Sequence, residues 1–465
     1  MNRKNVCIVG AGLGGIATGA LLAAKGHQVE VFEKENVLGG RALTLDGNNL
    51  TLDEYQKIFH RFDMWLPFSE PDVETIFEEN MLQGYRLDLG FHLLGFVDKS
   101  PIVKTLDRFD ERLDILSSKF GGIHPAGGVM SNLSQYLSAV DKMRLLPLVV
   151  RFLSMRKSTL SEFQKIPLSE TLDKYCKGRI KDVLSIAGKL IATMNDLDKI
   201  STGETIRVLE QWIRGARRAG SYPRNGSVAL SEAFANIIRG NRGKVHLGTK
   251  VDQIFQKDNA AGGVEVDGEK KHYGTIVSNL PVQDLFTIVS EKWFPSDYVK
   301  NMKNLEGTGS VCAYYALNKI NPSLVGKPFA FVEQDLDVEG SDAVGVVDFL
   351  TADPSVGLSP EKRYLVQAYI ICSPREAVDK MKVSMLREVL DEKMEVLIPG
   401  FRENLVFALY PTSWHLDGVA KTVEHEKPES ATPLKNLYLV GDCVQSAGIG
   451  MNCAVDSAIK LSEKI

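Results

Sequence analysis

Three glycines near the start of the chain have the spacing of a phosphate-binding turn. Gly10, Gly12 and Gly15 follow an apolar run at residues 6–9 and precede a second apolar run at residues 16–24. Glycine at these positions allows a tight turn, a close approach of the backbone to a pyrophosphate, and close packing of a helix on a strand. The first turn of that helix presents unpaired N–H groups to phosphates. The pattern therefore predicts a strand, a phosphate-binding loop and a helix.

An acidic residue stands where such a fold selects its nucleotide. Glu33 follows Gly15 by 18 residues and stands at the end of residues 29–32, which we expect to be the second strand. A carboxylate there can accept hydrogen bonds from ribose hydroxyls and would repel a 2′-phosphate. A glycine-rich loop before a core helix would explain the glycines alone, but not the strand, helix and acid together. We therefore expect a dinucleotide whose adenosine ribose is free of a 2′-phosphate.

Two further motifs indicate which dinucleotide binds. A Gly-Gly-Arg sequence occupies residues 39–41, and an apolar strand near the other end of the chain closes on Gly-Asp at 441–442. A glycine-rich turn at 448–450 then opens a helix expected over residues 452–464. A carboxylate at the end of that strand can lie beside a ribityl or pyrophosphate group. The helix N-terminus can face the edge of a flavin ring.

Together these motifs resemble the phytoene desaturase and retinol-saturase-like branch of the FAD-dependent flavin amine oxidase superfamily. The resemblance rests on GAGLGG and EVFEK, on GGRA, and on LYLVGD and GIGMN. It implies FAD as the cofactor, with Glu33 on the adenosine ribose, the backbone of Val251 on the adenine, and residues 441–442 and 450–452 along the flavin. The implied cofactor-binding residues are Gly10, Gly12, Leu13, Gly14, Gly15, Glu33, Lys34, Gly39, Gly40, Arg41, Val251, Gly441, Asp442, Gly450, Met451 and Asn452.

The resemblance also implies a fold class. We expect an α/β protein in which a Rossmann-like FAD-binding domain is combined with a discontinuous mixed α+β substrate domain. Residues 1–45, 85–100, 220–285 and 405–465 are assigned to the FAD-binding domain, and residues 101–219 and 286–404 to the substrate domain. Residues 46–84 form an insertion that is atypical of the family, because Asp88 stands 47 residues after Arg41. Its aromatic and acidic residues leave three roles open: a lid, a dimer contact or a plain surface elaboration.

The expected substrate domain contains both strand and helix patterns. Residues 310–317 and 364–371 are rich in β-branched and aromatic residues and are predicted strands, whereas residues 383–396 have the pattern of an amphipathic helix. Residues 143–153 are mostly apolar and are flanked by basic residues, although Pro147 argues against one continuous helix there. This segment could be a core helix or a surface that contacts a membrane or admits a lipid.

His92 is the best candidate for a titratable catalytic residue. A flavin supplies the redox chemistry, so the protein must position the substrate and can supply a proton donor or acceptor. His92 lies in a segment, residues 90–95, that runs toward the flavin in the family which this chain resembles. A hydrogen-bonded structural histidine is the alternative. Tyr410, Trp414 and His415 could line the substrate pocket or simply pack in the core.

The C-terminal motif favours one branch of the superfamily. The amine-oxidase branch typically has Ala-Gly-Glu where this chain has Val-Gly-Asp at 440–442. We therefore expect desaturation, saturation or isomerisation of C–C bonds in a small apolar, isoprenoid-like substrate. The alternatives are a flavin amine oxidase or a protoporphyrinogen-oxidase-like enzyme. A more remote alternative is a non-catalytic escort protein that binds prenyl lipids.

Composition restricts the classes of partner. The 465 residues include 55 basic and 59 acidic side chains, and the net charge of −4 gives no electrostatic argument for nucleic acid. The eight histidines show no metal-ligand spacing, and none of the six cysteines forms a C-x-x-C pair, as expected for free thiols in a reducing cytoplasm. With no visible signal peptide and no apolar run of ~18 residues, we expect a cytoplasmic protein, with peripheral membrane contact and oligomeric state left open.

Overall fold

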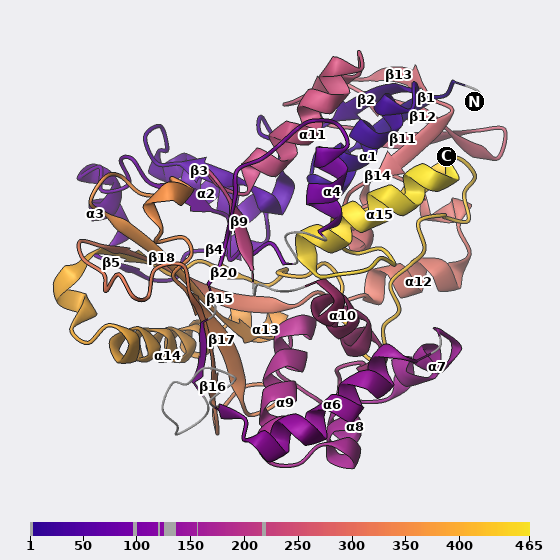
Figure 1. Ribbon diagram of the computed structural model, residues 1–465. Helices are drawn as coiled ribbons and strands as arrows, with labels where there is room; N and C mark the ends of the chain where they lie inside the picture. The colour runs from indigo at the N-terminus through magenta and orange to yellow at the C-terminus, as the bar shows by residue number, and fades with distance from the viewer. Residues whose placement is uncertain (1–2, 96–99, 120, 125–135, 156, 216–219) are drawn as a thin grey trace.

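The computed structural model describes residues 3–95, 100–119, 121–124, 136–155, 157–215 and 220–465. Two large β-sheets form its centre (Figure 1). The first sheet is parallel and gathers strands from distant parts of the chain. Its strands, in spatial order, are β10 (Lys244–His246), β2 (Gln28–Phe32), β1 (Asn5–Val9), β14 (Thr275–Ser278) and β21 (Leu437–Leu439). The predicted Rossmann-like α/β fold is confirmed, and the expected strands at residues 6–9 and 29–32 are β1 and β2.

Both faces of this sheet are covered, and its central strands β1 and β14 are buried along nearly their whole length. Along β1, Val6 and Ile8 pack with the helices, while Cys7 and Val9 pack in the cluster on the opposite face. On one side α1 (Leu13–Ala24) packs against both α11 (Val228–Gly240) and α15 (Gly450–Lys464), and α4 (Pro101–Asp107) packs on α15 and α11. The opposite side carries the antiparallel strands β11 (Gln253–Lys257), β12 (Ala260–Val266) and β13 (Glu269–His272), and helix α12 (Ser296–Asn304).

The second sheet has nine strands and forms the core of the remaining part. The predicted strands at residues 310–317 and 364–371 are β15 and β18, and they pair antiparallel along nine residues. The predicted helix at 383–396 is α14 (Lys380–Leu397), which covers one face together with α13 (Pro374–Ala377). The strands are β4 (Met64–Trp65), β5 (Ser69–Glu70), β8 (Gly122–His124), β15 (Gly309–Leu317), β16 (Pro328–Glu333), β17 (Ala343–Asp348), β18 (Tyr364–Cys372), β19 (Leu405–Leu409) and β20 (Thr412–Ser413).

One predicted domain boundary differs from the strand pairing. Residues 405–413 were assigned to the FAD-binding domain, but β19 and β20 pair with β15 in the nine-stranded sheet. The reason is that β19 is apolar on both sides: Phe407 and Leu409 pack in one buried cluster and Ala408 packs in the cluster under α14. Such a strand suits the interior of a covered sheet. The rest of the domain division stays a prediction.

The insertion at residues 46–84 is part of the core. It contains α2 (Leu52–Arg61) and α3 (Val73–Glu78), and it is framed by the antiparallel pair β3 (Thr44–Asp46) and β6 (Arg86–Asp88). Tyr55 and Phe59 are buried and meet edge to face with ring centroids 4.4 Å apart. The indole N–H of Trp65 donates to the carbonyl of Ala377 at 2.8 Å. These aromatic residues therefore stabilise the substrate part by packing and hydrogen bonding.

A group of helices forms the lower part of the molecule in Figure 1. They are α6 (Ala139–Leu153), α7 (Lys157–Glu162), α8 (Leu168–Tyr175), α9 (Arg179–Ala192) and α10 (Thr202–Gly215). The expectation that Pro147 would interrupt a helix is wrong, because α6 runs through it. Pro147 is exposed, so the carbonyl of Met143 that it leaves without a backbone partner can bond to water. The last pair of strands, β7 (Ile115–Ser117) and β9 (Ser221–Pro223), is antiparallel.

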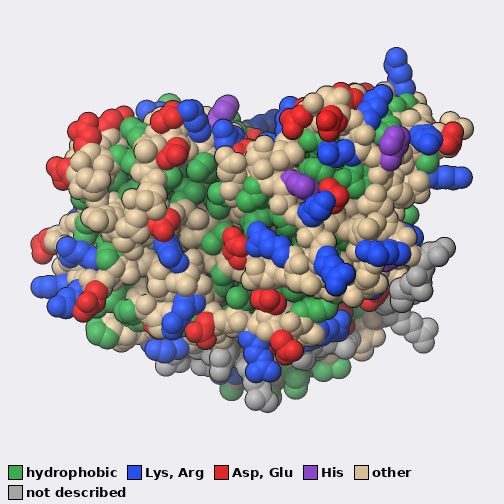
Figure 2. All heavy atoms as spheres, turned by 90° about the horizontal axis from the view of Figure 1, so that it is seen from above, with side chains coloured by type: hydrophobic (Ala, Val, Ile, Leu, Met, Phe, Trp, Pro, Cys, Tyr) green, Lys and Arg blue, Asp and Glu red, His purple; other side chains and the backbone are tan. Residues whose placement is uncertain are grey.

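The two chain ends lie close together beside the first sheet (Figure 1), where the Lys4 ammonium donates to the carbonyl of Ile465 at 3.2 Å. Figure 2 shows basic and acidic side chains interspersed over the face that is seen from above.

Candidate functional site

The three glycine motifs meet at the carboxyl end of β1. The Gly39 N–H donates to the Ala11 carbonyl at 3.1 Å, and Gly39 forms a parallel bridge with Gly12. On the other side of the loop, a Cβ added to Gly14 would lie 2.9 Å from the Cα of Gly441. Backbones can approach this closely only where no side chain intervenes. The fold therefore brings residues 10–15, 39–41 and 441–442 to one place.

Two helices begin at this place without a side-chain cap. Gly12 is the N-cap of α1 and Ile449 is the N-cap of α15, and neither makes a side-chain capping hydrogen bond. Neither helix has an acidic residue in its first turn. The first-turn N–H groups of both helices are therefore available to an anionic ligand. This arrangement fits a dinucleotide with an anionic pyrophosphate and a polar flavin ring edge.

Glu33 lies at the end of β2, next to the glycine loop. It is 8 % exposed, and its two carboxylate oxygens accept hydrogen bonds from the N–H groups of Ala11 at 2.7 Å and Glu35 at 3.0 Å. Burial raises the pKa of Glu33, whereas these two N–H donors oppose the rise. The Thr249 N–H donates to the carbonyl of Glu33, which brings the loop containing Val251 to the same edge of the sheet. The Glu33 carboxylate is thus fixed beside the glycine loop, and its contact with a ribose stays a prediction.

We expect Glu33→Ala to lower FAD retention by ~1–3 kcal/mol, because a hydrogen-bonded charged group is lost. The measurement is the FAD dissociation constant of the purified variant. Glu35→Gln is the matched control, since the Glu35 carboxylate is directed at Arg61 instead of the loop. An FAD affinity unchanged by Glu33→Ala would remove the ribose role.

Arg41 and Asp442 form an ion pair between a segment near the start of the chain and one near its end. A guanidinium N–H of Arg41 donates to the Asp442 carboxylate at 2.7 Å, and a second donates to the His415 carbonyl at 2.8 Å. The other Asp442 oxygen accepts from the N–H of Gly418 at 2.8 Å. Burial raises the pKa of Asp442, but the positive charges of Arg41 and Lys427 outweigh it and lower the pKa to about 2. The Gly-Gly-Arg and Gly-Asp motifs therefore share one partly buried ion pair.

The first turn of α15 is tied to the segment that contains His92. Asn452 accepts a hydrogen bond from the Ser100 hydroxyl at 2.7 Å and donates to the Gly95 carbonyl at 3.0 Å. Met451, beside it, is partly buried against the core that α1 and α15 share. Asn452 thus holds Gly95 and Ser100 next to the helix N-terminus.

His92 lies over a buried carboxylate. Its Nδ1 is 3.2 Å from the Gly90 carbonyl and 4.0 Å from the Asp88 carboxylate, and the side chain is 14 % exposed. Asp88 itself is buried and accepts hydrogen bonds from three other side chains, which are Thr44, Tyr222 and Ser227. This network holds β6 in place. The structural contacts of His92 are therefore explained, and its catalytic role stays a prediction.

Two further residues at the site, Asn279 and Lys427, lie outside the three glycine motifs. Asn279 follows β14, and a Cβ on Gly12 or Gly14 would lie 2.6 Å or 2.7 Å from its amide. The signal was its position: it ends a parallel strand at the same carboxyl edge as Gly10, where such folds bind ligands. Lys427 donates to the Asp442 carbonyl at 2.6 Å from a segment with no regular element around it.

Of the three residues proposed to line the pocket, Tyr410 lies elsewhere. Its hydroxyl donates to Asp391 at 2.7 Å in the core under α14. Trp414 packs partly buried against the same core. His415 is the exception, because its carbonyl accepts from Arg41, which places its backbone at the site.

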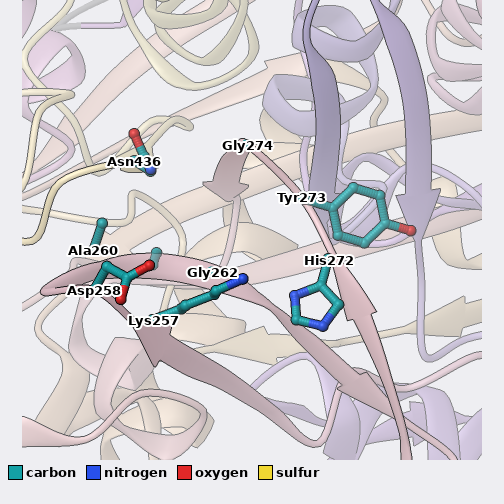
Figure 3. Close-up of a pocket in the computed structure, with 9 residues that line it drawn as sticks. Lys257, Asp258, Ala260, Gly262, His272, Tyr273, Gly274 and Asn436 are labelled. Carbon is teal, nitrogen blue, oxygen red and sulfur yellow. The ribbon is translucent and has the colours of Figure 1, made fainter.

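An open pocket of about 440 Å³ lies on the other side of the nucleotide domain (Figure 3). It is formed by β12, the ends of β11 and β13, the two residues that precede β14, and Asn436. Its polar side chains include Lys257, Asp258 and His272. It contains none of the predicted cofactor residues. Among the described residues, no group of three or more His, Cys, Asp or Glu side chains is placed to hold a metal ion.

The sequence and the fold match known flavoproteins. The family model for flavin containing amine oxidoreductases matches residues 13–465. A 4,4′-diapophytoene desaturase of Methylomonas sp is 22 % identical over 69 % of this chain and 62 % of its own length. A 15-cis-phytoene desaturase of Synechococcus elongatus is 24 % identical over 65 % of this chain and 63 % of its own length. The matched part thus spans less than two thirds of either relative.

The fold of one solved structure matches this chain over nearly its whole length. An oxidoreductase from Methanosarcina mazei has a TM-score of 0.74 at 19 % identity, covering 98 % of this chain and 99 % of that one. At this identity the likeness shows the fold. The family match over residues 13–465 confirms the resemblance drawn from the motifs. The chain belongs to the flavin-containing amine oxidoreductase family, and its cofactor is FAD.

Proposed function

We propose that this protein is an FAD-dependent oxidoreductase that desaturates, saturates or isomerises C–C bonds of an apolar, isoprenoid-like substrate. The observation that carries the proposal is the combination of the FAD site with relatives named as phytoene and diapophytoene desaturases. The Gly-Asp ending of the C-terminal motif supports the same branch.

Each part of the site has a task in such a reaction. FAD supplies the hydride chemistry when it is bound. The first turn of α1 would hold the pyrophosphate, Glu33 the ribose, and residues 441–442 and 450–452 would orient the ring. Because Nδ1 of His92 is directed at the Gly90 carbonyl, Nε2 is the atom that could exchange a proton with the substrate.

The proposal is tested by anaerobic mixing of the holoenzyme with a panel of substrates. In a desaturation, an acyclic polyene should reduce the oxidised flavin and bleach its visible absorption; in a saturation, it should reoxidise flavin that was first reduced chemically; in an isomerisation, it should change its double-bond geometry with no net change of the flavin. Amines and porphyrinogens should leave the oxidised flavin unchanged. Fast bleaching by a primary or secondary amine alone would overturn the isoprenoid assignment. A reaction with the porphyrinogen alone would favour the protoporphyrinogen-oxidase alternative.

We also propose that α6 contacts a membrane from the cytoplasmic side. Met143, Leu146 and Val150 are 68 %, 63 % and 57 % exposed and follow one another at helical spacing, so they form an apolar stripe. Exposed basic residues of the same helix, Arg144 and Arg151, flank the stripe. An apolar face bordered by cations is typical of a helix that lies in the interface of an anionic bilayer. No helix among the described residues is long and apolar enough to cross a membrane.

The inner side of α6 supports a route for an apolar substrate. Leu145, Leu148, Val149 and Phe152 line a small buried cavity of about 60 Å³ whose remaining lining is mostly apolar. The helix therefore separates an exposed apolar stripe from an apolar interior. A substrate dissolved in a bilayer would meet apolar side chains on both sides of α6.

Replacing the stripe with polar residues should abolish membrane binding without affecting the cofactor. We expect the variant M143Q/L146Q/V150S to bind anionic vesicles about tenfold more weakly or worse, because partial burial of three large apolar side chains is lost. Co-sedimentation with vesicles measures this. Its flavin content should equal that of the wild type, since α6 lies outside the cofactor motifs.

The matched control is M381Q/V396T on α14, where both apolar side chains are also exposed. This variant should bind vesicles like the wild type. Equal binding by the wild type and the α6 variant would contradict the membrane proposal.

A further inference from the structure

Lys427 is a partly buried lysine between two segments of the candidate site. Its ammonium donates to the Asp442 carbonyl at 2.6 Å and lies 3.7 Å from the thiol of Cys453. Cys453 is the fourth residue of α15, so the ammonium lies beside the first turn of that helix. In the described part of the chain, no carboxylate forms an ion pair with Lys427.

The charges around Lys427 do not balance. Arg41 is paired with Asp442, and Lys421 is paired with Asp417, which is buried and directly precedes the Gly418 that binds Asp442. Lys427 is thus a third cation beside two carboxylates. Burial and the neighbouring Arg41 lower the pKa of His415, so that imidazole adds no further positive charge near neutral pH.

The helix dipole increases this imbalance. The N-terminus of α15 carries a partial positive charge, and it has neither a capping side chain nor an acidic residue in its first turn. Burial disfavours the charge of Lys427, but the neighbouring Asp417 and Asp442 carboxylates help to raise its pKa, so the ammonium stays charged. Each of these carboxylates is already paired with another cation, so the positive charges outnumber the negative ones. The arrangement therefore has room for one more negative charge.

We propose that Lys427 provides positive charge to the isoalloxazine ring of FAD and stabilises the negative charge that the ring gains on reduction. Two electrons and one proton leave the reduced ring with one negative charge. Lys427 contacts Asp442 and the first turn of α15, the segments that the family resemblance places along the flavin, and not the glycine loop that would face the pyrophosphate. This inference depends on FAD binding and not on the proposed substrate, so its failure would leave the proposed reaction intact.

The test uses holoenzyme variants K427M and K427R. Their two-electron reduction potentials are measured against a reference dye with an artificial reductant, and their sulfite affinities by absorbance titration, because sulfite also leaves negative charge on the ring. We expect K427M to bind sulfite about tenfold more weakly and to have a potential lower by about 30 mV, the value of a tenfold change for a two-electron couple. K427R should keep both values, and so should the control K435M, since Lys435 is exposed.

Three outcomes would overturn the proposal. The first is a fully flavinylated K427M whose potential and sulfite affinity equal those of the wild type. The second is a K427M that binds FAD more weakly at an unchanged potential, which would assign the charge to the pyrophosphate. The third is loss of flavin from both K427M and K427R, which would make Lys427 a packing residue. If only K427M loses its flavin, a K427R with the wild-type potential would support the role of charge.

Discussion

Replacing Gly12 with valine should yield a protein that purifies without flavin. Gly12 is the N-cap of α1, where the backbone must approach the pyrophosphate most closely. Its Cβ would lie 2.6 Å from the Asn279 amide, and the two valine methyl groups would extend farther into the phosphate position. We expect FAD to bind about 100-fold more weakly, ~3 kcal/mol, the upper end of the usual cost of overpacking.

The ratio of flavin to protein absorbance in the purified variant measures the effect. Gly240→Ala is the matched control, because a Cβ at the end of α11 meets nothing within 4 Å. A normal flavin content in Gly12→Val would mean that the pyrophosphate does not bind at this loop.

Replacing Asp442 with asparagine should destabilise the protein as well as weaken FAD binding. The variant leaves the Arg41 guanidinium without its carboxylate. Removing one partner of a buried ion pair costs 3–5 kcal/mol, and we expect about 2–3 kcal/mol here, because the Arg41 side chain retains 29 % exposure. Urea unfolding at pH 7 measures the change. The control is Asp53→Asn, which removes an exposed ion pair with Lys57 and should leave the unfolding midpoint unchanged.

The ionisation of the Asp442 carboxyl group makes the stability difference between the wild type and Asp442→Asn depend on pH. The folded-state pKa of Asp442 is about 2, whereas an unfolded aspartate titrates near ~3.9. Because the folded pKa is the lower of the two, the ionised carboxylate contributes its full stability above about pH 4 and loses it as the pH falls through about 2. The difference in unfolding free energy between wild type and Asp442→Asn should therefore shrink over that interval. A difference that persists unchanged at pH 2 would show that the ion pair is not its source.

The parts of the site that depend on local geometry could be predicted from the sequence. The strand, loop and helix around Gly10 and Gly15 are consecutive, and each glycine meets a requirement of the backbone at its own position. A Cβ on Gly15 would lie 2.1 Å from the Gly10 carbonyl, so the spacing alone identifies the turn. Glu33 was predictable for the same reason, since the length of one helix and one strand places it beside the loop.

Contacts between distant segments could not be predicted in this way. Arg41 and Asp442 are 401 residues apart, and their motifs predict that each lies near the cofactor but not that they pair. Asn279 and Lys427 belong to none of the three glycine motifs. Asn279 reaches the site because β14 lies beside β1 in the sheet, whereas Lys427 reaches it because its loop packs against Asp442. Tyr55 and Phe59 gave a signal of aromatic content, but only the packing of α2 shows that they form core.

We propose that FAD in this protein exchanges hydrogen with C–C bonds of a polyene. The most direct measurement is mass spectrometry of an acyclic polyene of the phytoene type, extracted from anionic vesicles after incubation with the holoenzyme under anaerobic conditions. We expect a product that differs from the substrate by two hydrogens, or in double-bond geometry, and that forms with the wild type but not with flavin-free Gly12→Val. A polyene recovered unchanged, from a preparation whose flavin is reduced by an amine, would contradict it.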